Sequence, residues 1–221
     1  MTTTCRAGVI GLGILGSQYA TLLYKRVDVK LAAVVDLREE TAQATAALTG
    51  ATAYTSYEEM FKTERLDLVV VATPDPLHLA PSLAAIKAGV PAIIQEKPFA
   101  TTLEDATKLY EAIEKSGCKF YVNYANRATP LDIATRYVTQ QGLLGDVVYG
   151  ESRLDDNISV PTQLWGKRSK DWAAGSSTAH FLLSHAVDLL RFYFSPAEVT
   201  DVYPIKQELV LGYTPDVYDA Y

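Results

Sequence analysis

Cysteine and histidine are scarce in this chain of 221 residues, and their scarcity excludes several kinds of site. The two cysteines, Cys5 and Cys118, lie far apart and share no short motif, so we expect reduced structural thiols rather than a disulfide. Only three histidines are present, and no combination of them with cysteine has the spacing of zinc ligands. We therefore predict no metal site.

Long apolar runs and blocks of like charge are missing as well. No stretch approaches the ~20 residues that a helix needs to span a bilayer, and residues 1–6 lack the charged and apolar pattern of a leader peptide. A net charge of −6, spread along the chain, disfavours nucleic acid as a partner, because such proteins need a basic surface. We expect a cytoplasmic protein that binds neither membranes nor nucleic acid.

The clearest positive signal lies at residues 9–16, Val-Ile-Gly-Leu-Gly-Ile-Leu-Gly. An apolar run ends there in glycines spaced G-x-G-x-x-G, and an amphipathic segment follows. A second apolar run ends in Asp36, twenty residues after Gly16. This order predicts a dinucleotide-binding βαβ unit, and the alternative is a tight strand–helix turn without a ligand.

Each glycine of this unit has a predicted role. Gly11 permits the tight turn, Gly13 lets the backbone approach a pyrophosphate, and Gly16 lets the helix close on the sheet. The helix N-terminus offers N–H groups and the positive end of its dipole to the phosphates. The predicted pyrophosphate-binding residues are Gly11, Gly13, Ile14, Leu15 and Gly16.

Asp36 and Arg38 bear on the choice between NAD and NADP. A carboxylate at the end of the second strand accepts hydrogen bonds from the ribose hydroxyls and repels a 2′-phosphate, so Asp36 favours NAD. Arg38 keeps NADP possible, because a guanidinium can pair with that phosphate. We predict that both residues contact the cofactor.

Residues 1–123 alternate strand and helix patterns, which predicts an α/β fold with a doubly wound parallel sheet. The expected strands are 7–10, 31–35, 51–54, 68–72, 92–95 and 120–122, and the expected helices are 15–25, 39–48, 76–88 and 102–115. Ser56 should cap a short helical turn, with Glu59 as its capping-box partner. This first domain, 1–123, is the predicted dinucleotide-binding Rossmann domain.

From residue 124 the pattern changes to that of an α+β domain. The expected elements are a helix at 131–140, a strand at 147–153, an apolar helix at 178–194 and a strand at 197–206. We predict that residues 124–221 form a partial C-terminal domain for substrate binding and oligomerisation.

Polar residues follow two buried strands of the first domain, at the sheet edge where doubly wound folds bind ligands. Thr73 and Pro74 follow one strand, and His78 lies in the first turn of the next helix, where packing or capping is the commoner role. Glu96 and Lys97 close the other strand as either an inert ion pair or a functional group. In the functional interpretation, Lys97 orients a substrate hydroxyl and exchanges its proton.

His185 and Asp188 lie three positions apart on the apolar helix, hence on one face of it. A buried histidine beside a carboxylate can be a satisfied core pair. It can equally be an acid/base group on a stiff platform, since a histidine with its ordinary pKa of about 6.5 suits proton transfer.

Together these segments resemble the Gfo/Idh/MocA oxidoreductase family. The matching motifs are GLGILG with Asp36, ATPDPLH at 72–78, EKP at 96–98, Arg127 with Pro130 in YANRATP, and HAVD at 185–188. The resemblance implies an N-terminal Rossmann domain and a C-terminal domain whose open, mainly antiparallel sheet forms homo-oligomer contacts. It also implies NAD(P)-dependent hydride transfer on sugars, inositols or related polyols.

The resemblance assigns further roles by position. Lys97 matches the catalytic lysine of the family and His185 its catalytic histidine, and the Lys97–Pro98 bond is implied to be cis. In the implied reaction, His185 takes the substrate hydroxyl proton while Lys97 holds the oxygen. The predicted cofactor contacts now include Thr73, Pro74, His78, Glu96 and Lys97, and the predicted substrate contacts are Lys97, Arg127, Trp165 and His185.

Two features depart from the family pattern. Phe181 and Leu183 replace the acidic residue and the glycine that usually precede the catalytic histidine, although His180 could substitute in part. The sequence also stops where family members continue, so we expect a truncated C-terminal domain. Both features suit an alternative function, a catalytically impaired dinucleotide-binding paralogue that acts as a binding or partner subunit, and a third possibility is a fragment that does not fold alone.

The polar loop before the apolar helix carries aromatic and basic residues. These residues either line a sugar pocket or anchor the loop at the surface. They are Trp165, Lys167, Arg168 and Trp172.

Overall fold

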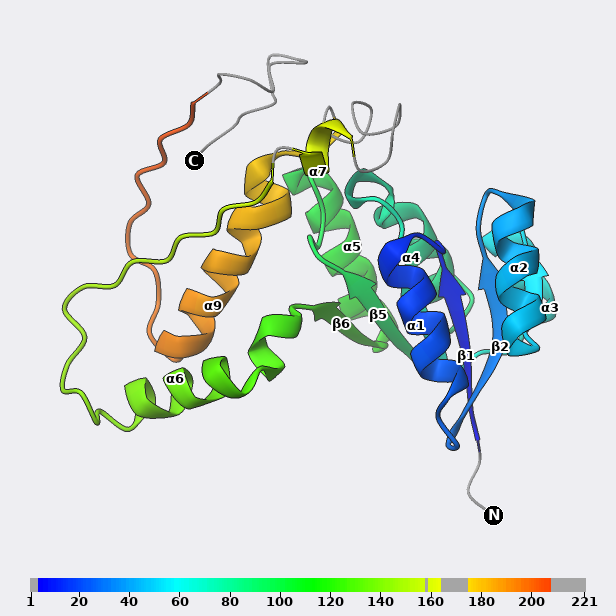
Figure 1. The fold of residues 1–221 in the computed structure, drawn as a ribbon, viewed down its shortest axis with the longest axis horizontal. Helices are drawn as coiled ribbons and strands as arrows, with labels where there is room; N and C mark the ends of the chain where they lie inside the picture. Colours follow the sequence, from blue (N-terminus) through cyan, green and yellow to red (C-terminus); the bar gives the residue numbers. More distant parts are fainter. Residues whose placement is uncertain (1–3, 158, 164–174, 208–221) are drawn as a thin grey trace. The chain divides into compact units, whose positions relative to one another are not determined.

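A parallel six-stranded sheet organises the first part of the chain (Figure 1). The computed structural model describes residues 4–157, 159–163 and 175–207. The chain divides into two compact units, 1–123 and 124–221.

The strand order of the sheet reverses between β1 and β4. The strands are β1 (Cys5–Ile10), β2 (Val29–Val35), β3 (Thr52–Tyr54), β4 (Leu68–Val71), β5 (Ala92–Glu96) and β6 (Lys119–Asn123). They lie in the order β3-β2-β1-β4-β5-β6, and every neighbouring pair is parallel. The predicted doubly wound α/β fold is therefore confirmed, and its reversal point is where such folds bind ligands.

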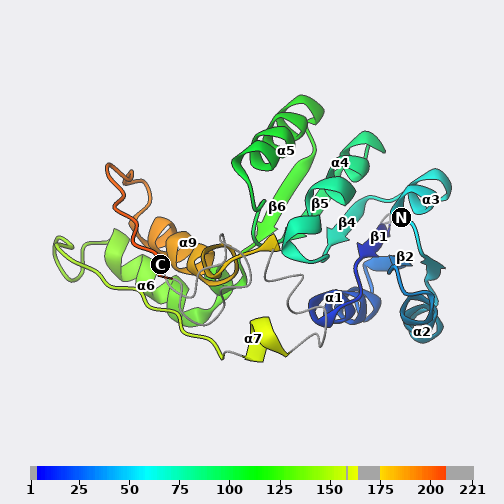
Figure 2. The same ribbon diagram turned by 90° about the horizontal axis from the view of Figure 1, so that it is seen from above.

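Helices cover both faces of this sheet. They are α1 (Ile14–Tyr24), α2 (Glu39–Thr49), α3 (Tyr57–Thr63), α4 (Leu79–Lys87) and α5 (Leu103–Ser116). Figure 2 shows α1 and α2 on one face and α3, α4 and α5 on the other. This division follows from right-handed crossovers that run in opposite directions away from β1.

Two hydrophobic cores fill the space between the sheet and these helices. Val9 of β1 packs in one core with Leu23 of α1, while its neighbour Ile10 packs in the other with Met60 of α3. Successive side chains of a strand point to opposite faces, so both cores draw on the same strands. Burial on both faces also explains why Leu68–Val71 is an uninterrupted apolar run.

The structure confirms Ser56 as the N-cap of α3, but the carboxylate bonded to the Ser56 hydroxyl is that of Glu58 and not that of the expected Glu59. The Ser56 hydroxyl accepts the Glu59 N–H at 3.3 Å, and it donates to the Glu58 carboxylate at 2.6 Å. The helix expected at 76–88 is divided into a 3₁₀ turn, η1 (Asp75–Leu77), and α4. The turn is tight because the Leu77 N–H bonds to the Pro74 carbonyl at 2.8 Å.

The regular elements among the described residues of the second unit are helices and helical turns. Its elements are η2 (Ala125–Ala128), α6 (Pro130–Gln140), α7 (Ser159–Thr162), a π-helical turn η3 (Ala179–Leu183) and α9 (Ser184–Phe194). The helices expected at 131–140 and 178–194 are confirmed, the second with the π-helical turn at its start. α6 packs against α9, and the Tyr193 hydroxyl donates to the Asp132 carboxylate between them.

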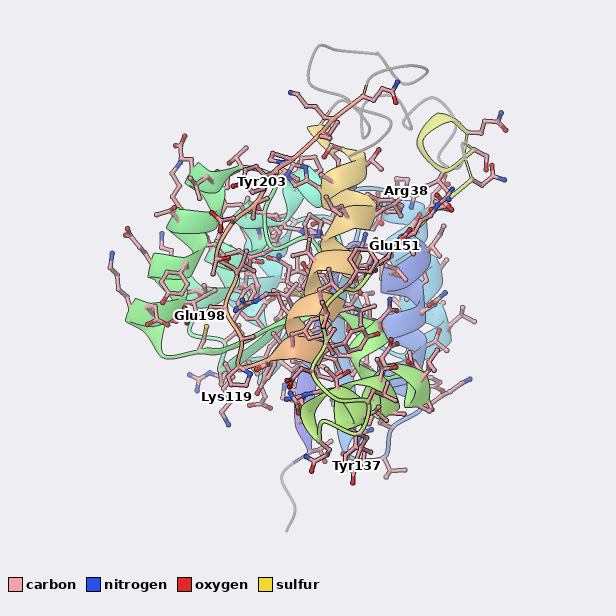
Figure 3. All side chains as sticks on the ribbon, turned by 90° about the vertical axis from the view of Figure 1, so that its left-hand side faces the viewer. Arg38, Lys119, Tyr137, Glu151, Glu198 and Tyr203 are labelled. Carbon is pink, nitrogen blue, oxygen red and sulfur yellow. The ribbon has the colours of Figure 1, made fainter. Side chains whose placement is uncertain are left out.

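The strands expected at 147–153 and 197–206 are wrong. Both stretches are irregular, and the side chains of Glu151, Glu198 and Tyr203 on them are exposed (Figure 3). A strand is held by hydrogen bonds to a neighbouring strand, and the described residues of this unit supply no such neighbour. They therefore do not form the antiparallel sheet that the resemblance implies.

Two features are absent from the described residues, a membrane-spanning helix and a metal-binding cluster. No helix there is both long and apolar enough to cross a membrane. The same residues contain no group of three or more histidine, cysteine, aspartate or glutamate side chains that could hold a metal ion. Cys5 and Cys118 are free thiols.

Ile93 of β5 provides a test of the core. Its side chain is 0% exposed, so Ile93→Ala should lower the free energy of unfolding by about 2–5 kcal/mol through lost burial and a cavity. Chemical denaturation followed by circular dichroism measures this loss. Leu103→Ala is the matched control, because Leu103 is 85% exposed and should change stability by about 0.5 kcal/mol or less. Equal losses in the two variants would contradict this description of the core.

Candidate functional site

The carboxyl edge of the parallel sheet gathers the predicted site residues of the first unit. The glycine-rich turn, residues 11–16, follows β1, Asp36 follows β2, Thr73 follows β4 and Lys97 follows β5. These four strands are consecutive neighbours in the sheet. Segments far apart in the sequence therefore meet at one edge.

Two glycines of the turn are required by the fold itself. Gly11 has a φ of +87°, and a Cβ on it would lie 2.7 Å from the Ala72 carbonyl oxygen. A Cβ on Gly16 would lie only 1.7 Å from the Gly11 carbonyl oxygen. The helix α1 can thus begin directly against the turn because neither residue has a side chain.

Gly13 is different, because the fold gives no reason for a glycine there. Its φ of −68° is open to any residue, and no described atom lies within 4 Å of the place where a Cβ would stand. A bound group that approaches the backbone closely does require a glycine. Gly13 precedes α1, whose first-turn amides lack intrahelical acceptors and suit an anion.

Asp36 is held beside the glycine-rich turn by three hydrogen bonds. It accepts the Leu12 N–H at 3.0 Å, the Arg38 N–H at 2.9 Å and the Arg38 Nε at 3.1 Å. Burial works against its ionisation, but these bonds outweigh burial and hold the pKa of its carboxyl below the ordinary value. Asp36 is therefore an anion, and Arg38 is its ion-pair partner.

Lys97 lies in a buried turn after β5. The residue is 8% exposed, and the Lys97–Pro98 bond is cis, as the resemblance implied. The preceding carboxylate, Glu96, accepts the Tyr19 hydroxyl at 2.6 Å and the Asn123 amide at 2.8 Å. Burial and the hydrogen bond to Glu96 raise the pKa of Tyr19, so this hydroxyl stays a donor.

His78 lies between two backbone carbonyls of the carboxyl edge. The residue is 1% exposed, with Nδ1 2.9 Å from the Pro98 carbonyl oxygen and Nε2 2.8 Å from the Thr73 carbonyl oxygen. These contacts hold the ring in place within the protein, and its contact with the cofactor stays a prediction. Pro74 of the same loop is exposed.

In the second unit, the structure brings Arg127 together with Asp188. The guanidinium donates through Nε at 2.8 Å and through Nη2 at 2.5 Å to the two carboxylate oxygens. It also lies 5.4 Å from the centre of the Phe192 ring. The hydrogen bonds that Arg127 donates to Asp188 raise the pKa of the guanidinium, which is therefore a charged group held in a fixed direction.

His185 packs against an aromatic side chain. Its ring lies edge-to-face with Tyr124, with 6.0 Å between the ring centres. The neighbouring His180 lies one helical turn earlier, and its Nδ1 is 2.8 Å from the Ser177 hydroxyl. Trp165, another predicted substrate contact, lies outside the described residues.

Several residues of these networks were missed by sequence reasoning. Gln95 interrupts an apolar strand and Asn123 ends one, so a polar residue in such a place was a usable signal. Tyr19 and Tyr124 had none, because an aromatic residue in a helix or after a strand is ordinary core composition. Their roles depend on partners distant in the sequence.

A doubly wound sheet with a glycine-rich turn after β1 is the architecture of dinucleotide-binding proteins. A family model described as an oxidoreductase family with an NAD-binding Rossmann fold matches residues 5–124. Those residues make up more than half of the chain, so the chain belongs to this family, the Gfo/Idh/MocA oxidoreductases. The resemblance seen in the sequence is confirmed.

Individual relatives resemble this chain over most of its length. An inositol 2-dehydrogenase of Rubrobacter xylanophilus is 32% identical over 200 residues, which are 89% of this chain and 54% of that protein. A 1,5-anhydro-D-fructose reductase of Ensifer adhaerens is 28% identical over 89% of this chain and 59% of its own length. The chain thus spans a little over half the length of these curated relatives.

A solved structure shares the fold. The crystal structure of myo-inositol 2-dehydrogenase from Lactobacillus plantarum superposes with a TM-score of 0.76 at 24% identity. The match covers 86% of this chain and 56% of the other. At this identity the likeness concerns the architecture alone.

Gly13 and Gly16 should respond differently to the same substitution. Gly13→Ala meets no described atom, so the melting temperature should be unchanged while the affinity for NAD falls by about tenfold or more, or about 1.4 kcal/mol. Gly16→Ala should fold poorly, because the new methyl group overlaps the Gly11 carbonyl. Thermal denaturation and calorimetric titration with NAD measure both effects. Unchanged NAD affinity in Gly13→Ala would contradict a pyrophosphate at this turn.

Asp36 should control the preference between the two dinucleotides. Asp36→Asn keeps an acceptor for the Leu12 N–H but removes the charge that repels a 2′-phosphate and pairs with Arg38. The ratio of the Kd for NADP to the Kd for NAD should fall by about tenfold. Asp28→Asn is the matched control, since that carboxylate forms an exposed pair with Arg26. A ratio that stays constant in Asp36→Asn would contradict the assignment.

Proposed function

We propose that this chain carries the cofactor-binding part, and some of the catalytic part, of an NAD-dependent dehydrogenase acting on a CH–OH group of an inositol, sugar or related polyol. The observation that carries the proposal is Gly13, a glycine that the fold does not need, on the same sheet edge as Lys97. The printed activities of the relatives, inositol 2-dehydrogenase and 1,5-anhydro-D-fructose reductase, support this class of substrate.

The cofactor would lie along the carboxyl edge of the sheet. The amides of Ile14 and Leu15, at the start of α1, would bind the pyrophosphate. Asp36 would accept the hydroxyls of the adenosine ribose, and its negative charge makes NAD the preferred dinucleotide. Pro74 and Glu96 would face the nicotinamide half, at the ends of β4 and β5.

When bound, NAD supplies the hydride acceptor, and the protein supplies proton handling and orientation. The Lys97 ammonium would donate a hydrogen bond to the substrate oxygen and stabilise the negative charge that develops on it. His185 would take the proton of the substrate hydroxyl. Arg127 would add a charged contact to the substrate, with its direction set by Asp188.

The remaining roles of the second unit follow the family resemblance. We propose that residues 124–221 supply substrate contacts, with Trp165 among them, and that the protein forms homo-oligomers through this part of the chain. A cytoplasmic location belongs to the same proposal.

Lys97→Met tests the proposed chemistry on the 221-residue chain. Turnover of a panel of inositols and sugars, followed as NADH absorbance, should fall by about 10²–10³-fold because the donor that stabilises charge on the substrate oxygen is lost. The affinity for NAD should change little, since the pyrophosphate and ribose contacts lie on other strands. Lys108→Met, at an exposed lysine of α5, is the matched control and should keep full turnover.

Two results would count against the proposal. Unchanged turnover in Lys97→Met would remove Lys97 from the reaction. NAD binding by the unaltered chain without turnover of any substrate would favour the alternative, a binding paralogue in which Phe181 replaces the usual acidic residue.

A further inference from the structure

We propose that His78 and Gln95 are positioning residues for Lys97, acting through the backbone of the turn that follows it. The inference rests on the proposed function of Lys97. The Pro98 carbonyl oxygen accepts from His78 Nδ1 at 2.9 Å and from Gln95 Nε2 at 3.2 Å. Gln95 Nε2 also donates to the Phe99 carbonyl at 2.9 Å. Two side chains from different elements therefore hold consecutive carbonyls.

Because these side chains are buried, they destabilise the fold unless their polar atoms form hydrogen bonds. Gln95 is 0% exposed, in a strand that is otherwise apolar until its last residue. An amide or imidazole buried without hydrogen bonds destabilises a protein. A well-packed apolar residue at either position would avoid that cost, but it would leave the Pro98 carbonyl with one partner fewer.

The orientation of the Gln95 amide is fixed by its surroundings. The Pro98 and Phe99 carbonyls can only accept hydrogen bonds, so the amide must turn its NH₂ group toward them. Its Oε1 then faces Ser82, whose buried hydroxyl donates to it at 2.8 Å. Ser82 belongs to α4, which thereby fixes the side chain that holds the turn.

His78 joins two loops at the carboxyl edge. Its ring nitrogens lie between the carbonyl oxygen of Thr73 after β4, at 2.8 Å, and that of Pro98 after β5, at 2.9 Å. The ring therefore connects the loop after β4 with the loop after β5. A displacement of either loop would lengthen one of these two contacts.

Hydrogen bonds consequently fix both sequence neighbours of Lys97. On its N-terminal side, Glu96 is bound by Tyr19 and Asn123, and on its C-terminal side Pro98 is bound by His78 and Gln95. A displacement of about 1 Å of a reacting group can slow a reaction about 100-fold. Hydrogen bonds on both sequence neighbours suit a side chain whose direction matters.

Paired substitutions at His78 separate its two hydrogen bonds. His78→Asn keeps a donor near the place of Nδ1, and hence the Pro98 bond, whereas His78→Gln keeps one near the place of Nε2, and hence the Thr73 bond. Gln95→Met removes both donors from the turn at similar volume. Ser82→Ala is the milder variant, because it only frees the amide to rotate. Leu109→Ala is the control for lost stability, since Leu109 is buried in α5 outside this network.

Two measurements follow each variant. One is kcat together with the Kd for NAD. The other is the rate at which an acetylating reagent labels Lys97, determined by mass spectrometry relative to the exposed lysines Lys108 and Lys115 of the same molecule. The labelling rate reports the surroundings of the Lys97 amine without any turnover.

If His78 and Gln95 position Lys97, kcat and the labelling of Lys97 should change while the Kd for NAD stays nearly constant. His78→Gln and Gln95→Met should lower kcat by about 100-fold, leave the Kd for NAD within about threefold, and change the relative labelling of Lys97. His78→Asn and Leu109→Ala should resemble the unaltered chain, and Ser82→Ala should fall between.

Other results would overturn the inference. Equal behaviour of His78→Asn and His78→Gln would do so, as would labelling of Lys97 that does not respond in Gln95→Met or, should that variant not fold, in Ser82→Ala. If the unaltered chain shows no turnover, the proposed function fails, while labelling still decides whether the network positions Lys97.

Discussion

The close approach of α1 to the glycine-rich turn sets the geometry of the whole carboxyl edge. Gly16 stands where any side chain would overlap the Gly11 carbonyl, and Gly11 in turn stands against the backbone of Ala72. This contact aims the N-terminus of α1 across the reversal point of the strand order. It also brings the Leu12 N–H within reach of Asp36, so the anion at the end of β2 is fixed by the same turn.

At that edge, hydrogen bonds of polar side chains, and not hydrophobic packing, fix the positions of the charged and polar groups. Asp36 is tied to two backbone amides, Glu96 to a tyrosine and an asparagine, and the Pro98 carbonyl to a histidine and a glutamine. In the second unit, Asp188 fixes Arg127 in the same manner. The cores hold the elements together, and these bonds determine where individual charges point.

Sequence patterns were sufficient wherever structure depends on neighbours along the chain. The glycine spacing, the apolar strand at 68–71 and the Ser56 cap all express local geometry, and all were predicted. Contacts between distant residues were not predicted, for a different reason. His78 bonds to a carbonyl twenty residues away and Arg127 to a carboxylate sixty-one residues away, distances at which spacing carries no information. The strand expected at 147–153 failed similarly, because alternation does not supply a partner strand.

The hydrogen bonds among Tyr19, Glu96 and Asn123 link residues as much as 104 positions apart. Synthesis proceeds from the N-terminus, so Asn123 is the last of the three to leave the ribosome. A nascent chain therefore contains the glycine-rich turn and the first helix long before the carboxylate beside Lys97 can acquire its second donor. The residues of this edge leave the ribosome in sequence, the glycine-rich turn first and the second donor to Glu96 last.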